Sequence, residues 1–280
     1  MDEYEVAVTR HYGAPGVEDR LVHAAVSLGL DPDDLGWQDL AAADELHIGG
    51  APAALQLAEA AGIGPGTAVL DIGSGIGGPA RAFAGQFGAR VMGIDLTPEF
   101  VDAAAALTRR CGLDDQVQFA VANALEMPFA DSSFDAATML HAGMNIPQKQ
   151  RLFAEVARVL TDGASFAVYD IMSGPTGKPR YPLPWATAPD HSFVSAADDY
   201  LAAGLAAGFE AGSSTDLSGA AIEYMERGRS ALENPPEMGL HLLLGPEGTE
   251  RMANLVAGFR SGALEARQII FTLRPQRVPG

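Results

Sequence analysis

Short apolar runs alternate with amphipathic stretches through the middle of the chain. The apolar runs predict strands at residues 67–72, 89–94, 117–122, 134–140 and 165–171. The stretches between them predict helices at residues 79–87, after Thr97, and at residues 146–160, with Gly163 just past the last one. Thr97 and Pro98 suit the N-cap and first position of a helix. Strands that alternate with helices in this way indicate a parallel sheet covered on both faces.

The segment before this alternation has a helical pattern. Candidate helices lie at residues 17–28 and 32–46, and the second is entered through Asp31. An alanine-rich helix is predicted at residues 51–62, and it leads into a glycine- and proline-containing turn at residues 64–66.

Beyond residue 172 the composition changes. Residues 173–191 are rich in proline and glycine and predict an irregular loop. Helices at residues 196–207, 218–232 and 247–263 and strands at residues 209–213 and 267–273 are expected after it. This late, non-parallel strand pair, with helices inserted between its members, would cap the ligand edge of the sheet.

These elements predict an α/β fold with a Rossmann-like, seven-stranded, mostly parallel sheet, helices on both faces and a helical cap. We expect residues 1–62 to form an N-terminal helical lid and residues 63–172 to form the nucleotide-binding core. Residues 173–280 would supply the substrate loop, the helical cap and the final strands that complete the sheet. A chain of 280 residues suits one large domain or one domain with a cap.

The charge balance limits the classes of molecule that the chain can bind. The chain has 18 basic and 36 acidic residues, a formal net charge of −18, which would repel nucleic acid and anionic lipid. We therefore expect a small-molecule acceptor, no nucleic-acid partner, no membrane partner, and a cytoplasmic monomer or homodimer without signal peptide or membrane span. The single cysteine, Cys111, and the scattered histidines predict neither a disulfide framework nor a metal site.

A glycine-rich turn follows the first predicted strand. Gly73, Gly75 and Gly78 match the pattern G-x-G-x-x-G between a strand and a helix, which is typical of nucleotide-binding turns. Glycines allow unusual dihedral angles and close approach of the backbone to a ligand. Glycines that serve only a tight turn are the alternative explanation.

Asp71 selects among the nucleotides that such a turn can bind. It lies two residues before Gly73, and its carboxylate would oppose a dinucleotide pyrophosphate at the helix N-terminus. The same carboxylate would favour binding of a ligand with an ammonium and a sulfonium group, and this charge difference is worth about 1–2 kcal/mol of binding free energy. We therefore expect S-adenosylmethionine as the cofactor and disfavour NAD.

The ends of the next two strands carry further polar candidates. Asp95, followed by Leu96, ends the second predicted strand about twenty residues beyond the glycine turn, where an acid can accept both ribose hydroxyls. Helix capping is the other possible role of Asp95. Asn123 and Ala124 end the third strand and are placed to hold adenine, with the Asn123 amide oxygen accepting from its amine.

These residues together resemble the class I methyltransferase family. The resemblance rests on residues 71–75, 93–95, 123–124, 127–129 and 133–135 and covers most of the chain. Residues 44–50, 140–146 and 181–185 resemble the sarcosine/dimethylglycine-type N-methyltransferase branch. The family commonly has aspartate where this chain has Asn123, which would weaken discrimination without abolishing binding.

The resemblance implies further roles. It places His47 near the methionine part of the cofactor and lets Tyr12 close over it as a lid. Ser74 and Leu140 would also contact the cofactor, and Met144 would contact the acceptor. His47 as a surface or capping residue is the alternative.

Methyl transfer chiefly needs alignment and a dry pocket, and a base helps when the acceptor is an amine or hydroxyl. His141, after the fourth predicted strand, is the leading catalytic base, and His191 is the second candidate. Tyr181 and Trp185 would form an aromatic wall that attracts a cationic acceptor. The alternative for His141 is that it only orients a loop. The alternative for Tyr181 and Trp185 is that they only pack their loop against the core.

The sequence leaves the acceptor open. Nitrogen or oxygen of a small molecule is the leading hypothesis. Carbon of an isoprenoid or another specialised metabolite is the second, because the cap offers apolar residues that could line a pocket: Met225, Leu240, Leu242, Leu243, Leu244 and Phe259. The same residues could instead form the core of the cap. An NAD-dependent oxidoreductase and a non-catalytic nucleoside-binding module are the remaining alternatives.

Overall fold

The computed structural model describes residues 3–13, 15–233, 235–244 and 247–275. Its strands are β1 (Ala68–Ile72), β2 (Arg90–Asp95), β3 (Val117–Val121), β4 (Phe134–Leu140), β5 (Leu160–Ser173), β6 (Phe209–Asp216) and β7 (Leu264–Leu273). They form one sheet in the order β3-β2-β1-β4-β5-β7-β6. Strands β1 to β5 pair in parallel, and β7 is antiparallel to both neighbours. The predicted seven-stranded, mostly parallel, Rossmann-like sheet is confirmed.

Helices cover both faces of this sheet. They are α1 (Glu3–Tyr12), α2 (Val17–Ser27), α3 (Trp37–Leu40), α4 (Gly50–Ala60), α5 (Gly78–Phe87), α6 (Pro98–Arg110), α7 (Lys149–Val159), α8 (Ala197–Ala206), α9 (Ser218–Glu233), α10 (His241–Leu244) and α11 (Gly248–Ser261). In the part of the chain that the structure describes, each helix is too short or too polar to cross a bilayer.

The alternation of side chains along β1 shows how the core is divided. Val69 points to one face and joins the apolar cluster that contains Leu57 of α4 and Phe83 of α5. Leu70 points to the other face and joins the cluster that contains Phe153 of α7. Because successive residues of a strand face opposite ways, an apolar run such as that of β1 is buried on both sides.

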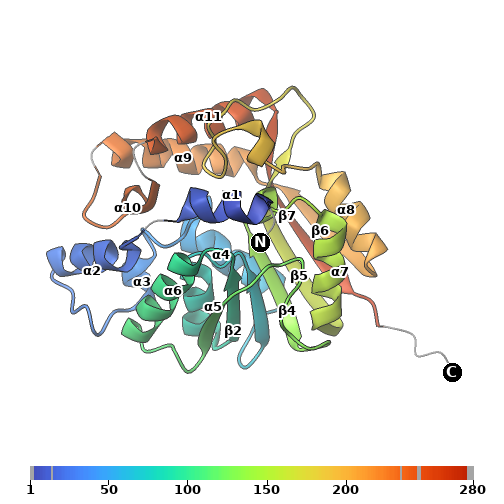
Figure 1. The fold of residues 1–280 in the computed structure, drawn as a ribbon, viewed down its shortest axis with the longest axis horizontal. Helices are drawn as coiled ribbons and strands as arrows, with labels where there is room; N and C mark the ends of the chain where they lie inside the picture. Colours follow the sequence, from blue (N-terminus) through green and yellow to red (C-terminus); the bar gives the residue numbers. More distant parts are fainter. Residues whose placement is uncertain (1–2, 14, 234, 245–246, 276–280) are drawn as a thin grey trace.

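The strand order reverses between β1 and β4, which are neighbours in the sheet although β2 and β3 separate them in sequence. In doubly wound sheets a ligand crevice opens at this switch point, beyond the carboxyl ends of the strands. Figure 1 shows α1 lying between this part of the core and the cap helices α9 and α11. The fold therefore places the glycine turn after β1 beneath an N-terminal helix and a C-terminal cap.

One predicted helix is wrong. Of residues 32–46 only Trp37–Leu40 is helical. The Asp39 carboxylate accepts a hydrogen bond from Gly36 N–H at 2.8 Å, and the chain after α3 continues in turns toward α4. This hydrogen bond caps the N-terminus of α3 at Gly36, so the helix starts there and not at residue 32, which the helical pattern alone did not reveal.

Smaller differences occur at other elements. Helix α7 begins at Lys149, and the chain enters β5 at Leu160 directly after it, so Gly163 lies within β5 and does not end a helix. Helices α1 and α10 were not predicted as separate segments.

Candidate active site

The turn between β1 and α5 depends on glycine at two positions. Gly73 has φ of +72°, and a Cβ there would lie 2.4 Å from Cβ of Ala142. A Cβ on Gly78 would lie 2.5 Å from the carbonyl oxygen of Asp44. Gly73 N–H donates to the Ile94 carbonyl at 2.8 Å, so the turn is tied to the end of β2. The turn therefore packs tightly against the segment before α4 and the loop after β4.

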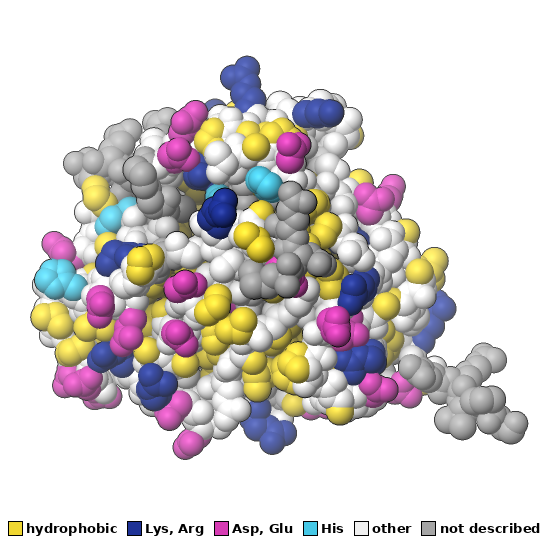
Figure 2. Space-filling view, viewed as in Figure 1, with side chains coloured by type: hydrophobic (Ala, Val, Ile, Leu, Met, Phe, Trp, Pro, Cys, Tyr) yellow, Lys and Arg dark blue, Asp and Glu magenta, His cyan; other side chains and the backbone are white. Residues whose placement is uncertain are grey.

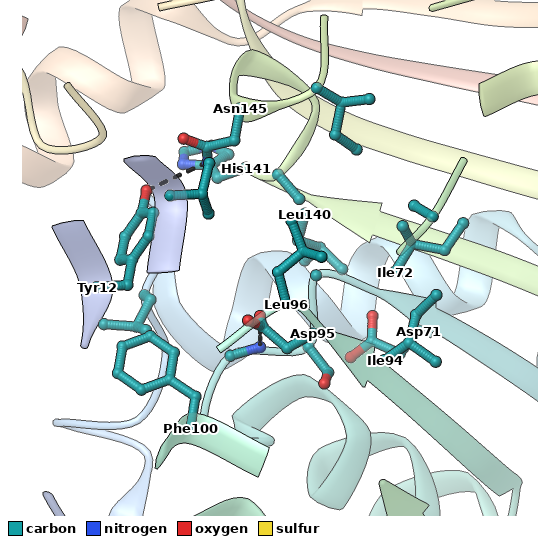
Figure 3. Close-up of a pocket in the computed structure, with 18 of the residues that line it drawn as sticks. Tyr12, Asp71, Ile72, Ile94, Asp95, Leu96, Phe100, Leu140, His141 and Asn145 are labelled. Carbon is teal, nitrogen blue, oxygen red and sulfur yellow. Dashed lines mark hydrogen bonds between the residues drawn. The ribbon is translucent and has the colours of Figure 1, made fainter. Parts of the chain in front are cut away.

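A cavity lies beside this turn. Figure 3 shows Asp71 and Asp95 on one side of it, and Tyr12, His141 and Asn145 across from them. Every residue predicted to contact the cofactor lines this cavity: Tyr12, His47, Asp71, Gly73, Ser74, Gly75, Asp95, Leu96, Asn123, Ala124 and Leu140. Hereafter it is called the cofactor cavity.

Five polar atoms of the cofactor cavity are buried without a hydrogen-bond partner: Asp44 Oδ1, Asp71 Oδ2, Asn145 Oδ1, Ser74 Oγ and His141 Nε2. The first three are oxygens that accept hydrogen bonds, and leaving such atoms unpaired costs about 1–3 kcal/mol each. An ammonium group carries three N–H donors, whereas a diphosphate offers acceptors only. The lining therefore fits S-adenosylmethionine better than a dinucleotide.

Asp71 is buried at the end of β1, and one of its oxygens accepts from Thr138 Oγ at 2.8 Å. Burial raises the pKa of Asp71 to about 7, although the Thr138 hydrogen bond works in the opposite direction. A cation at the unpaired oxygen would favour the ionised form. Cofactor binding and ionisation of Asp71 are therefore expected to be coupled.

Asp95 links the glycine turn to the start of α6. Its two oxygens accept hydrogen bonds from Gly75 N–H at 3.0 Å and Thr97 N–H at 2.9 Å. Thr97 and Pro98 occupy the predicted N-cap and first position of α6, although the Thr97 side chain makes no capping hydrogen bond. The bond from Thr97 N–H to Asp95 ties the N-cap residue itself to the end of β2. The contact of Asp95 with ribose hydroxyls stays a prediction.

Asn123 connects the end of β3 to helix α1. Its amide oxygen accepts from the Tyr4 hydroxyl at 2.9 Å and from Leu125 N–H at 2.8 Å. Its amide nitrogen donates to a Glu5 carboxylate oxygen at 2.5 Å. With both lone pairs of the amide oxygen engaged, Asn123 holds α1 over the cofactor cavity. Its predicted contact with adenine is untested.

This contact predicts the effect of aspartate at position 123. Asn123→Asp would place a carboxylate against Glu5, repel α1 and speed cofactor release, by about threefold to tenfold. Adding Glu5→Gln should restore slow release, because glutamine can donate to the new carboxylate. Dissociation of S-adenosylhomocysteine, followed by stopped-flow fluorescence, tests this. Failure of Glu5→Gln to rescue Asn123→Asp would show that Asn123 does not act through α1.

A second cavity adjoins the first and is hereafter called the acceptor cavity. The two share Tyr12, Leu46, His47, Phe100 and His141. The remaining lining is mainly apolar and comes from Ile48, Met144, Ile171, Pro184, Trp185, Met225, Leu240, Leu243, Met252 and Leu255, with His11, Tyr224, Glu247 and Arg251 as polar members. Met144 and Trp185, which were predicted to contact the acceptor, line this second cavity, and their contact with an acceptor stays a prediction.

Two predicted residues lie elsewhere. Tyr181 packs against the apolar core and lines neither the cofactor nor the acceptor cavity. His191 is exposed and lines a surface groove that adjoins the acceptor cavity. The loop after β5 determines these positions, because it turns Trp185 into the acceptor cavity and leaves His191 at the surface. Within the described ranges, no three His, Cys, Asp or Glu side chains are grouped as metal ligands.

His141 stands at the wall between the two cavities. It has φ of +49°, an uncommon value for a residue other than glycine, and its N–H donates to the Tyr169 carbonyl at 2.8 Å. Burial, aided by the neighbouring His47, holds the pKa of His141 well below its usual value. The ring is therefore neutral at pH 7, and its buried Nε2 is without a partner.

His47 is paired with a residue that sequence reasoning did not single out. Its Nε2 lies 2.7 Å from a Glu45 carboxylate oxygen, and both side chains are buried. Burial would lower the pKa of His47, but the hydrogen bond and charge of Glu45 outweigh it, and the pKa is raised. The acidic residues beside His47 in the stretch 44–47 were the available signal.

The comparisons with known proteins agree with this geometry. Residues 70–168 match the family described as "Methyltransferase domain". The chain is 38% identical over 144 residues to "Sterol methyltransferase-like 1" of Botryococcus braunii, which covers 51% of this chain and 36% of that protein. It is 40% identical over 100 residues to "Probable tocopherol O-methyltransferase, chloroplastic" of Oryza sativa subsp. japonica, with 36% and 28% covered. The chain thus spans about a third of the length of these relatives.

Solved structures match over nearly the whole chain. Geranyl diphosphate C-methyltransferase from Streptomyces coelicolor A3(2) superposes with a TM-score of 0.72 at 22% identity, covering 97% of this chain and 98% of that one. A protein of Galdieria sulphuraria assigned as a sarcosine dimethylglycine methyltransferase gives a TM-score of 0.66 at 18% identity, with 81% and 85% covered. At these identities the likeness shows a shared fold.

Proposed function

We propose that this chain is a class I methyltransferase that transfers a methyl group from S-adenosylmethionine to a small, largely apolar molecule. The match of residues 70–168 to a methyltransferase domain supports this. The wall shared by the two cavities carries the proposal. One cavity presents unpaired acceptors to a cationic cofactor, the other is mainly apolar, and His47 and His141 belong to both.

When bound, S-adenosylmethionine supplies an electrophilic methyl group on its sulfonium sulfur. Asp44 and Asp71 would hold the ammonium group, and Asp95 would hold the ribose. Tyr12 of α1 is fixed by Asn145 Nδ2, which donates to its hydroxyl at 3.2 Å, and closes the cavity from above. Such alignment and exclusion of water can supply about 7–11 kcal/mol of the barrier lowering.

His141 is the proposed base for a nitrogen or oxygen acceptor. Its neutral ring can take the proton that a protonated amine or a hydroxyl must lose. The unpartnered Nε2 lies in the wall that both ligands would touch. The buried Glu45–His47 pair adjoins it, with ring centroids of His47 and His141 6.0 Å apart.

Carbon is the second candidate for the methylated atom. The apolar lining of the acceptor cavity favours it. Of the six cap residues expected to line such a pocket, Met225, Leu240 and Leu243 do so, whereas Leu242 and Phe259 do not, and the Leu244 side chain lies outside the described part of the structure. The rings of Trp185 and Tyr224 in the same wall would stabilise a cation formed when an alkene attacks the methyl group. Several relatives, including the geranyl diphosphate enzyme, are named as C-methyltransferases.

Calorimetry with S-adenosylmethionine and with NADH tests the cofactor. We expect S-adenosylmethionine to bind and NADH not to bind, and binding of NADH alone would refute the proposal. Transfer from methyl-labelled S-adenosylmethionine to apolar alcohols, amines and alkenes, read by mass spectrometry, then identifies the methylated atom.

His141→Ala should lower turnover by about 10²–10⁴-fold while cofactor affinity changes less, if the acceptor needs a base. Steady-state kinetics alongside calorimetry separate the two effects. His23→Ala, which replaces an exposed histidine of α2, is the matched control. Unchanged turnover in His141→Ala would leave His141 with a structural role only.

A further inference from the structure

A groove on the surface continues from the acceptor cavity. It runs between α1, the loop after β5 and α11, and it shares His11, Trp185 and Arg251 with the acceptor cavity. The acceptor cavity therefore has one wall in common with the cofactor cavity and another in common with this groove. A molecule that presents one end to the methyl group would have its other end at the groove.

The charge of the groove differs from that of the molecule. Its described lining contains Arg10, His11, His191 and Arg251 and no carboxylate, although acidic residues outnumber basic ones two to one in the chain. Figure 2 shows Lys or Arg and His side chains near the centre of this face, between α1 and the cap helices. The positive charges of Arg10 and Arg251 would attract an anion.

Two of these side chains are held in place by the loop after β5. Arg251 donates to the Leu183 carbonyl at 2.7 Å, and its side chain is only 12% exposed. His11 Nε2 donates to the Pro184 carbonyl at 2.7 Å. Arg251 also pairs with Glu247 at 2.7 Å, but that carboxylate is 55% exposed and can turn into solvent. The groove is therefore organised before a ligand arrives.

We propose that the methyl acceptor carries an anionic group, carboxylate or phosphate, at the end remote from the methylated atom, and that this group binds in the groove at Arg251 and Arg10. The inference rests on the proposed methyltransferase function and adds the chemical class of the acceptor. The apolar part of the acceptor would fill the cavity between Trp185 and His141.

Binding of decanol, decanoate and decyl phosphate to the full chain saturated with S-adenosylhomocysteine tests this, because the three probes share one tail. We expect at least one anionic probe to bind about tenfold more tightly than decanol, and the stronger of the two identifies the headgroup. Arg251→Gln should remove most of this difference, and Arg10→Gln should reduce it about threefold. Added salt should reduce it as well.

Arg260→Gln is the matched control, since Arg260 lies on the same helix, is exposed and pairs with Glu226 away from the groove. Equal affinity for the three probes, or a preference that survives both Arg251→Gln and Arg10→Gln, would overturn the inference. Arg10 is exposed, so its replacement keeps the test valid if Arg251→Gln does not fold. Binding of S-adenosylmethionine, measured in parallel, reports the proposed function separately.

Discussion

Asp71→Asn is expected to weaken S-adenosylmethionine binding by at least about tenfold, or about 1.4 kcal/mol, while the protein stays folded. Asparagine keeps the oxygen that accepts from Thr138 but loses the negative charge opposite the ammonium group. Calorimetry measures the affinity, and circular dichroism reports the fold. Asp102→Asn, an exposed position on α6, is the control for loss of one negative charge.

The same position predicts a pH dependence. Because the pKa of Asp71 in the free protein is about 7, lowering the pH below 7 protonates the carboxylate that the cation needs. Wild-type affinity should fall by up to about tenfold for each pH unit below 7, and Asp71→Asn should lack this component. If Asp71→Asn binds S-adenosylmethionine with wild-type affinity and wild-type pH dependence, the ammonium group of the cofactor does not bind at Asp71.

Arg81→Met is expected to lower the free energy of unfolding by about 3–5 kcal/mol. Arg81 of α5 is fully buried and donates to Asp44 Oδ2 at 2.7 Å and to the Ile76 carbonyl at 2.8 Å. Its other guanidinium nitrogen donates to Thr108 Oγ at 3.1 Å. The substitution would leave Asp44 buried without its partner. Urea denaturation measures the loss.

Two variants check this explanation. Arg90→Met replaces an exposed arginine whose guanidinium donates a hydrogen bond to the Gly66 carbonyl at 3.3 Å, and it should cost little. Asp44→Asn added to Arg81→Met should recover part of the lost stability, because it removes the unpaired charge. The loss in Arg81→Met should also be smaller at pH 5 than at pH 8, since burial already raises the pKa of Asp44 to about 6. A loss below about 1 kcal/mol would contradict the assigned role.

The corrections to the sequence-based predictions share a cause. The helix predicted at residues 32–46 is reduced to α3, which Asp39 caps at Gly36, and to turns from which Asp44 reaches Arg81. The sequence also did not reveal that Asn123 binds Tyr4 and Glu5, which come from a helix more than a hundred residues away. Such partners are chosen by packing between distant segments, which local periodicity does not encode.

The sequence by itself determined the sheet, the glycine turn and the place of the cofactor cavity. Alternating apolar runs and a strand–glycine–helix signature depend on neighbouring residues. Asp71, Gly73 and Asp95 could therefore be assigned to one edge of the sheet from the sequence alone. Only the tertiary structure decided that α1 is fastened through Asn123, that Glu45 pairs with His47, and that an apolar cavity opens into a basic groove at Arg251. These features join segments that meet only after folding, because each hydrogen bond or charge pair needs a partner that the chain brings from far away.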